Sequence, residues 1–164
     1  MSFILKLEEK FGKDSFTESE FRHNRRAIVD AAKVHDFLTF LKEECGFDML
    51  ADLTAVDYLN YPDATDRYGL IYVLTNTSTG ERAFIKTHLN DPDPTVKSVY
   101  PLWRGADWME REMYDMYGIT FEGHPDLRRI LLPEEFVSYP LRKDYPLRGR
   151  GERHNFEYIP RSEG

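Results

Sequence analysis

The fold class follows from residues 49–89, which read MLADLTAVDYLNYPDATDRYGLIYVLTNTSTGERAFIKTHL. Three runs in this stretch are rich in β-branched and aromatic residues and predict strands: Met49–Tyr58, Tyr68–Asn76 and Arg82–Leu89. The last two runs are joined by Thr77-Ser78-Thr79-Gly80, a connection typical of a hairpin. Because the connections are tight, we expect an α+β fold, built on a small, mostly antiparallel sheet with helices on one face.

Elements on either side of this stretch complete the predicted domain. Helical patterns are present at residues 2–11, 33–45, 95–103 and 107–117, and Arg26–Val29 has the pattern of a short strand. The second helical pattern places its apolar residues on one face and stops before Gly46. A chain of 164 residues fits one domain. We assign residues 1–133 to an α+β core domain that includes the helix at 107–117.

Residues 134–164 have a different character and are predicted to form an extended C-terminal arm. Prolines and glycines interrupt regular structure here, yet the segment holds aromatic residues: Phe136, Tyr139, Tyr145, Phe156 and Tyr158. Disordered tails are poor in aromatic residues, so we expect an arm that a partner protein orders and that makes few contacts with its own domain. Residues 141–161 also carry six basic and three acidic residues, a net charge of +3. The candidate partner-binding residues are Arg142, Lys143, Asp144, Tyr145, Arg148 and Arg150. A solvated basic tail is the alternative interpretation.

The composition excludes several classes of function. The formal net charge of −7 argues against a nucleic acid partner, whose phosphates need a basic surface. The single cysteine, Cys45, excludes an intramolecular disulfide and the four-thiolate set of an iron–sulfur cluster, and its place before Gly46 indicates a buried structural residue. No apolar run reaches the roughly 18–20 residues of a membrane span, and the first ten residues lack a signal-peptide core. We therefore expect a cytosolic protein that reaches a membrane only through a partner.

Residues 110–131 combine dense charge with large apolar side chains at helical spacing. Carboxylates buried by such a helix need cations to pair with them. Arg111 lies one turn before Asp115, and Arg128 and Arg129 follow a little later in the chain. A neighbouring guanidinium lowers the pKa of a carboxyl group, which suits an ion pair better than a general acid. The stretch is therefore predicted to be an interface element, although the pattern does not decide which carboxylate meets which arginine.

Other kinds of site are possible at the same place. Four carboxylates lie near one another in the sequence, at Glu110, Glu112, Asp115 and Glu122. Paired carboxylates are the machinery of glycoside hydrolysis, so a stand-alone carboxylate-dependent hydrolase is one alternative. The five histidines show no metal-ligand spacing, and we expect His124 to hydrogen-bond one of these carboxylates instead of a metal. No dinucleotide or P-loop fingerprint is present.

The stretch 110–131 resembles the signature of the 30 kDa-type subunit of proton-pumping NADH:quinone oxidoreductase, respiratory complex I. The matching residues are Glu110, Arg111, Glu112, Asp115, Met116, Tyr117, His124, Arg128, Ile130 and Leu131. The likeness continues through residues 52–58, 94–108 and 141–147. The candidate interface site, called the signature site below, consists of Glu110, Arg111, Glu112, Asp115, His124, Arg128 and Arg129.

The resemblance implies a role without redox chemistry in this chain. It implies FMN and iron–sulfur clusters in partner subunits and no cofactor here. It also implies contacts with the 49 kDa-type subunit and with the adjacent cluster-bearing subunit, on the cytoplasmic side of the inner membrane. There the chain would brace the quinone-site subunits while electrons pass from NADH to quinone. The equivalent subunit of an energy-converting hydrogenase or formate hydrogenlyase is an alternative that the resemblance leaves open.

Overall fold

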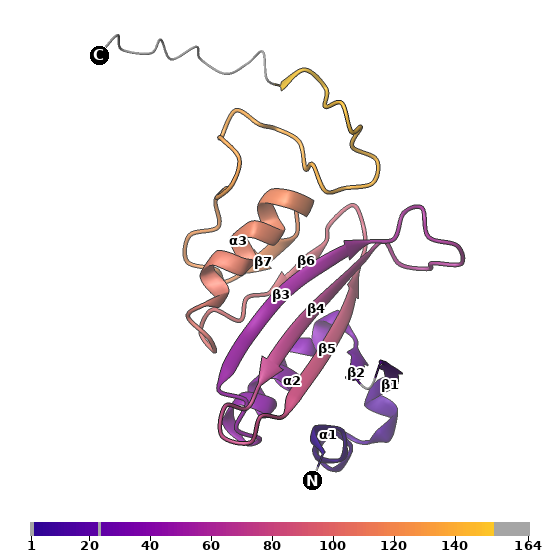
Figure 1. The fold of residues 1–164 in the computed structure, drawn as a ribbon, viewed down its shortest axis with the longest axis vertical. Coiled ribbons are helices and arrows are strands. Elements are labelled where there is room, and N and C mark those ends of the chain that lie inside the picture. Colours follow the sequence, from indigo (N-terminus) through magenta and orange to yellow (C-terminus); the bar gives the residue numbers. More distant parts are fainter. Residues whose placement is uncertain (1, 23, 153–164) are drawn as a thin grey trace.

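The computed structural model describes residues 2–22 and 24–152 of the chain. Their elements, in chain order, are α1 (Phe3–Phe11), a short 3-10 turn (Lys13–Ser15), β1 (Phe16–Phe21), β2 (Asn24–Val29), α2 (Ala31–Glu43), β3 (Met49–Asp57), β4 (Tyr68–Thr75), β5 (Arg82–Leu89), β6 (Thr95–Lys97), α3 (Ala106–Tyr117) and β7 (Thr120–Glu122) (Figure 1). Within these residues, no helix has both the length and the apolar character needed to cross a membrane.

The main sheet has five strands in the order β1-β2-β5-β4-β3. Neighbouring strands pair antiparallel except for β2 and β5, which run parallel with Arg26 opposite Phe84. The predicted α+β class with a mostly antiparallel sheet is therefore confirmed. The hairpin strand β1 was not predicted, because its sequence Phe16–Phe21 is largely polar and lies at the edge of the sheet.

The predicted helix at residues 95–103 is wrong. Thr95–Lys97 instead forms β6, which pairs in parallel with β7 in a separate two-stranded sheet. Val96 and Phe121 are both buried in this pair. The β-branched residues at 95 and 96 favour a strand, and Pro101 has no N–H with which to continue a helix.

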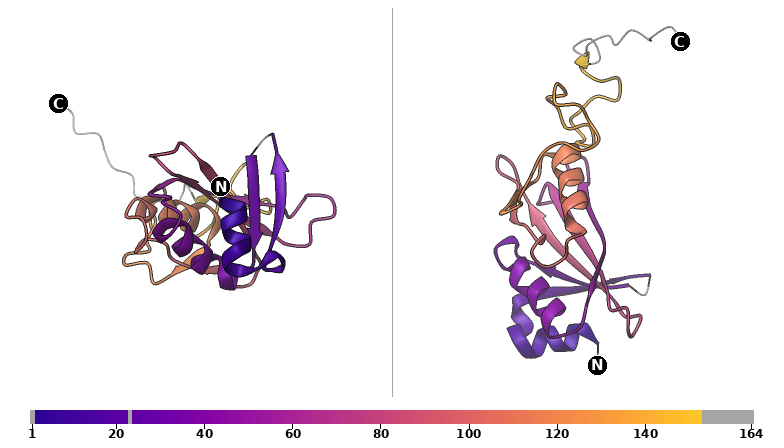
Figure 2. Two further views of the ribbon diagram at one scale, coloured as in Figure 1. Left: turned by 90° about the horizontal axis from the view of Figure 1, so that it is seen from below. Right: turned by 90° about the vertical axis from the view of Figure 1, so that its left-hand side faces the viewer.

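The two faces of the main sheet have different surroundings. Side chains that alternate along β4, namely Leu70, Tyr72 and Leu74, are buried in the core on the side of α1 and α2. Figure 2 (right) shows these two helices together on that side of the sheet. Helix α3 lies beside β3 and belongs to the same core through Met113. The indole N–H of Trp103, just before α3, donates to the backbone carbonyl of Phe47 at 3.3 Å and ties this region to the connection between α2 and β3.

Candidate interface site

Helix α3 carries the first half of the signature site. It ends where Gly118 adopts a left-handed conformation (φ 74°) and donates its N–H to the carbonyl of Tyr114. The helix buries the side chains of Glu110 and Asp115, while Trp108 stays 62% exposed on its outer side. One face of α3 therefore holds charged groups inside the protein, and the other presents a large apolar ring to the surroundings.

Asp115 forms the central charged contact of the site. Its Oδ1 lies 2.6 Å from Nη1 of Arg129. Its Oδ2 accepts the backbone N–H groups of Ile130, Leu131 and Leu132 at 3.0, 2.7 and 2.9 Å. Burial alone would raise the pKa of Asp115, but these backbone donors and the Arg129 guanidinium outweigh it and hold the pKa below its usual value. One ionised carboxylate thus fixes the backbone of residues 130–132 against the helix.

The other charged members of the site have different partners. Arg111 forms no ion pair with Asp115 but donates to the backbone carbonyls of Arg128 and Arg129, both at 3.2 Å. Arg128 is 66% exposed at its side chain and pairs with Asp126 at 2.9 Å. Glu112 is exposed on α3, and no ion pair reaches it from the described part of the chain. The structure therefore separates the two adjacent arginines, since Arg129 points inward and Arg128 outward.

Glu110 is the second buried carboxyl group of α3. It accepts the hydroxyl of Ser98 at 2.6 Å and the backbone N–H of Val99 at 2.7 Å. Burial raises the pKa of Glu110 to about 7, because removal from water outweighs these two hydrogen bonds and nearby Asp107 adds like charge. In contrast to Asp115, this group is held in a place that favours its neutral form.

His124 lies against the same pocket of acidic groups. Its Nε2 is 3.4 Å from Oδ1 of Asp107 and 3.9 Å from Oε2 of Glu110. Its Nδ1 accepts the backbone N–H of Asp126 at 3.0 Å, so in the neutral ring the hydrogen is on Nε2. That atom has no hydrogen-bond partner among the described residues, so the predicted hydrogen bond from His124 to a carboxylate is wrong, although the ring lies close to two carboxyl groups. The ring is fully buried. His124 thus lies in the loop after β7 and packs close to the first turns of α3.

The start of the arm is bound to its own domain, so the prediction of few such contacts is wrong for residues 138–144. Leu141 donates its N–H to the carbonyl of Met116 at 3.2 Å, and Nε of Arg142 donates to that of Tyr117 at 2.6 Å. Gly118 makes this possible, because a Cβ there would lie 2.6 Å from the ring of Tyr139. The arm residues from 153 onward, which include Phe156 and Tyr158, lie outside the described residues.

Arg67, which the sequence interpretation did not single out, joins the arm to the sheet. Its guanidinium contacts the carboxylates of Asp91, Asp57 (3.4 Å) and Asp144 (2.9 Å). Burial would raise the pKa of Asp144, but its hydrogen bond and ion pair with Arg67 hold that pKa below its usual value. One feature of the sequence pointed to such a contact. Asp57 lies at an inward-facing position of a predicted strand, and a buried carboxylate requires a cation or hydrogen-bond donor as its partner.

The remaining candidate arm residues differ in their surroundings. Lys143 and Arg148 are exposed at their side chains. Arg150 is also exposed and stacks on the ring of Tyr145 at 5.6 Å. Cys45 is buried as a free thiol, as its position before Gly46 indicated.

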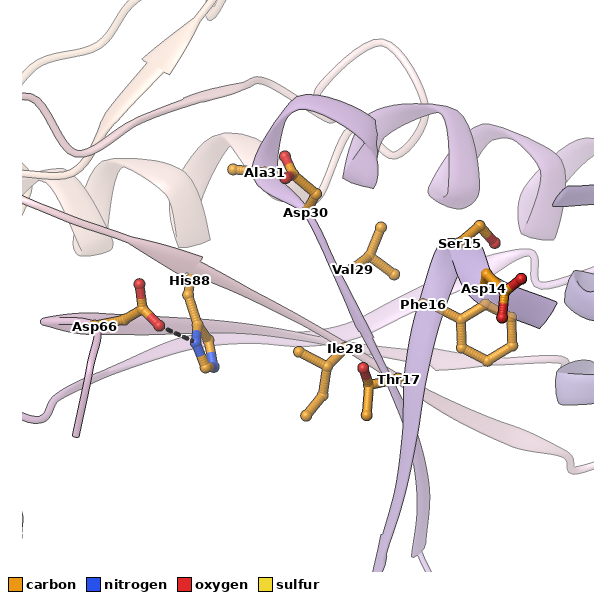
Figure 3. Close-up of a pocket in the computed structure, with 10 residues that line it drawn as sticks. All are labelled: Asp14, Ser15, Phe16, Thr17, Ile28, Val29, Asp30, Ala31, Asp66 and His88. Atoms are coloured by element: carbon orange, nitrogen blue, oxygen red, sulfur yellow. Dashed lines mark hydrogen bonds and ion pairs between the residues drawn. The ribbon is translucent and has the colours of Figure 1, made fainter. Parts of the chain in front are cut away.

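A surface hollow near the sheet is an alternative place for a site (Figure 3). It measures about 420 Å³ and contains Asp14, Asp30, Asp66 and His88 among its lining residues. Asp30 caps α2 by accepting the N–H of Ala32, and Asp66 pairs with His88 at 3.0 Å. Hydrogen bonds from Asn90 and His88 lower the pKa of Asp66, opposite to what a general acid requires. The hollow therefore gives no support to the hydrolase alternative.

Among the described residues, no group of three or more His, Cys, Asp or Glu side chains is placed to hold a metal ion.

Comparison with known proteins places the chain in a family. The sequence profile described as "Respiratory-chain NADH dehydrogenase, 30 Kd subunit" matches residues 27–151. An NADH-quinone oxidoreductase subunit of Geobacter sulfurreducens is 40% identical over 146 residues, 89% of this chain and 89% of that protein. The corresponding subunit of Trichlorobacter lovleyi is 42% identical over 148 residues, 90% of each chain.

Two solved structures share the fold. A trypsin-resistant fragment (1-134) of Nqo5 has a TM-score of 0.69 and 30% identity, covering 76% of this chain and 99% of the fragment. A chain of the membrane-bound sulfane sulfur reductase, an archaeal respiratory membrane complex, has a TM-score of 0.75 and 26% identity, covering 98% of this chain and 93% of that one.

The chain therefore belongs to the 30 kDa subunit family of respiratory-chain NADH dehydrogenase. It is a subunit of the NADH-quinone oxidoreductase complex and corresponds to the one that carries the letter C in these bacterial relatives.

Proposed function

We propose that the chain is a non-redox docking subunit of the peripheral arm of this complex. The observation that carries the proposal is that five exposed large apolar side chains lie on α3 or in the segment that follows it in the chain: Trp108, Leu131, Val137, Leu141 and Leu147. Exposed apolar groups gathered on one part of a surface mark a place where another protein binds. The backbone that presents Leu131 is held by Asp115, which accepts the Leu131 N–H at 2.7 Å and pairs with Arg129.

The rigid backing of these side chains suits a bracing role. Because Asp115 fixes residues 130–132 and Gly118 admits the arm, Leu131 and Leu141 are presented from preorganised backbone. Preorganised groups lose less conformational freedom on binding, which favours a stable assembly. The partners that fit the family are the 49 kDa-type subunit and the adjacent cluster-bearing subunit. FMN and the iron–sulfur clusters then belong to partner subunits, and the chain lies on the cytoplasmic side of the inner membrane.

The test is assembly of the complex with a variant of this surface. Trp108→Glu with Leu131→Glu should leave the isolated chain folded, because both side chains are exposed, but should remove it from the complex in native gels of solubilised membranes. Leu5→Glu on α1 is the matched control, an exposed apolar residue on another part of the protein. Normal incorporation of the double variant would show that the α3 surface is not the docking element.

The likeness to the sulfane sulfur reductase chain favours a second candidate function, in which the same fold serves as a subunit of a different respiratory membrane complex. The 26% identity to that chain is lower than the 40% identity to the Geobacter sulfurreducens protein, so the NADH-linked assembly is the better supported of the two. Purification of the complex from native membranes decides between them. A co-purifying flavin-bearing, NADH-oxidising subunit supports the NADH-linked assembly, and its replacement by another electron-input subunit supports the alternative.

A further inference from the structure

The face of the sheet opposite α1 and α2 is apolar although no described helix covers it. Its side chains include Ile28, Ile71, Val73 and Phe84, all of them only partly buried. The strand register brings them together, since Val73 is opposite Phe84, and Ile28 and Ile71 flank Lys86. In Figure 1 the strands β3, β4 and β5 are seen with no helix drawn across them. In a sheet with one face exposed to solvent, the side chains on that face are normally polar, whereas the side chains of β4 are apolar on both faces.

The cations on this face lack carboxylate partners within the described part of the chain. The ammonium of Lys86 donates to the hydroxyl of Tyr58 at 3.0 Å and lies 4.7 Å from the centre of its ring, and no carboxylate pairs with it. Arg26 lies over the ring of Phe21 at 5.8 Å, and its Nε is buried without a hydrogen bond. The whole chain, in contrast, has an acidic excess, with 29 acidic and 22 basic residues.

Charge on the face is therefore opposite to that of the whole protein. Besides Lys86 and Arg26, the strand β5 contributes Arg82, which is exposed at the start of the strand. The edge strand β3 contributes one acidic residue, Asp52, opposite Val73. An interface is favoured where a cationic surface meets an anionic one, and partly buried cations gain most from such a partner.

Gly69 shows how this surface is shaped. A Cβ at Gly69 would lie 2.7 Å from the ring of Tyr58 and 2.8 Å from Cε of Lys86. The absence of a side chain there leaves room for both groups against β4. Beside them the loop after β3, with Tyr61 stacked edge-on against Tyr58 at 5.7 Å, encloses a pocket of about 590 Å³. Its lining combines apolar and aromatic groups with Lys86 and also contains Asp63 and Asp66, the second of which pairs with His88.

We propose that this open sheet face, defined by Arg26, Ile28, Ile71, Val73, Phe84 and Lys86, is a second interface, and that its occupant is an acidic surface of another protein subunit. Carboxylates of that subunit pair with Lys86 and Arg26, and its apolar side chains cover Ile71 and Phe84. The inference rests on the proposed function in one respect, because it seeks the occupant among the subunits of the same complex. It concerns residues of the sheet alone, none of which belongs to α3.

A photocrosslinker distinguishes the two interfaces in the assembled complex. Benzoylphenylalanine is placed at position 84 or, in a separate variant, at position 108, and the complex is purified from native membranes and illuminated. We expect position 84 to crosslink to an Asp- or Glu-rich peptide of another subunit, identified by mass spectrometry. Reaction at position 108 alone, or crosslinking of position 84 only to a second copy of this chain, overturns the sheet-face interface and leaves the proposed function intact. A chain that co-purifies with no other subunit overturns both.

Charge reversal tests the pairing directly. Lys86→Glu should reduce the amount of chain retained in the purified complex by about tenfold or more at moderate salt, whereas Lys86→Arg should retain it. Lys33→Glu is the matched control, an exposed lysine on α2, on the other side of the sheet. The melting temperature of isolated Lys86→Glu shows whether that chain is folded. A folded Lys86→Glu chain that is retained like the wild type overturns the proposal.

Discussion

The backbone N–H of Lys143 donates to Oδ2 of Asp57 at 2.8 Å, across 86 positions of sequence. The same carboxylate accepts the N–H of Leu59 at 3.0 Å and faces Arg67 at 3.4 Å. Because the Asp57 side chain is fully buried, each of these donors replaces water that the group lost on folding. The start of the arm is therefore part of the domain's own stability, whatever else binds further along it.

Truncation measures that contribution. A chain ending at residue 133 should remain folded, as the solved fragment of its relative is, but should lose about 1–3 kcal/mol of unfolding free energy relative to one ending at residue 152. The cause is that Asp57 loses the Lys143 donor and Arg67 loses Asp144. Urea unfolding followed by circular dichroism gives the difference. Equal stability of the two chains would mean that residues 138–144 contribute nothing to the domain.

The two adjacent arginines should differ sharply when each is replaced. Arg129→Met leaves the buried Asp115 carboxylate without its ion pair and should cost about 3–5 kcal/mol of stability. Arg128→Ala removes an exposed pair with Asp126 and should cost less than about 1 kcal/mol. Thermal and denaturant unfolding of the isolated variants test this. Similar losses for both variants would contradict the inward and outward placement described above.

The free energy of unfolding should fall as pH rises, because the buried carboxyl group of Glu110 then ionises. Folding raises its pKa from 4.5 to about 7, so in that range the folded protein keeps a proton that the unfolded chain has released. The stabilising contribution is present below pH 4.5 and is lost as pH rises through about 7, by roughly 3 kcal/mol in total. Glu110→Gln, which mimics the neutral form, should flatten this slope and be the more stable protein at pH 8.

The control for Glu110→Gln is Glu112→Gln, an exposed carboxyl group on the same helix. Its stability should follow the wild-type pH dependence between pH 4.5 and 8. The interpretation fails if Glu110→Gln keeps the full wild-type slope in that range.

Gly118→Ala should loosen the arm. The backbone there has φ 74°, and an added Cβ would lie 2.6 Å from the Tyr139 ring and 2.8 Å from the Arg142 guanidinium. We expect a loss of about 1–3 kcal/mol and faster tryptic cleavage after position 133. Gly80→Ala has the same φ with nothing within 4 Å, so it isolates the backbone strain from the clash. If the two variants are equally stable and equally resistant to trypsin, the close approach of Tyr139 has no energetic weight.

The sequence predicted the helices and strands that are specified by their own residues. The three long strands appear through their β-branched and aromatic runs, and α3 begins at Ala106, one residue from the predicted start. The hairpin strand β1 was missed because Thr17, Glu18 and Ser19 give it no apolar periodicity, and its place at the edge requires none.

What could not be predicted depends on residues far apart in the chain. The choice of Arg129 over Arg128 as partner of Asp115 is fixed by the path of the backbone through residues 130–132, which bonds to the same carboxylate. The arm can dock only because Gly118 has no side chain where the Tyr139 ring lies, and the spacing of residues in the sequence does not predict this contact. The contact of Arg67 with Asp144 likewise joins a strand to the arm only after both are folded.

The parallel pairing of β2 with β5 has a consequence for synthesis. The ribosome makes the hairpin β1–β2 long before Arg82–Leu89, the strand that fixes it in the sheet. Ala27 and Val29 are buried in the finished core, but in a nascent chain that ends before β5 the strand β2 is paired on one side only, with β1. A hairpin that is translated early thus joins the sheet only through a segment encoded more than fifty codons downstream, a long-range contact of the kind that slows folding.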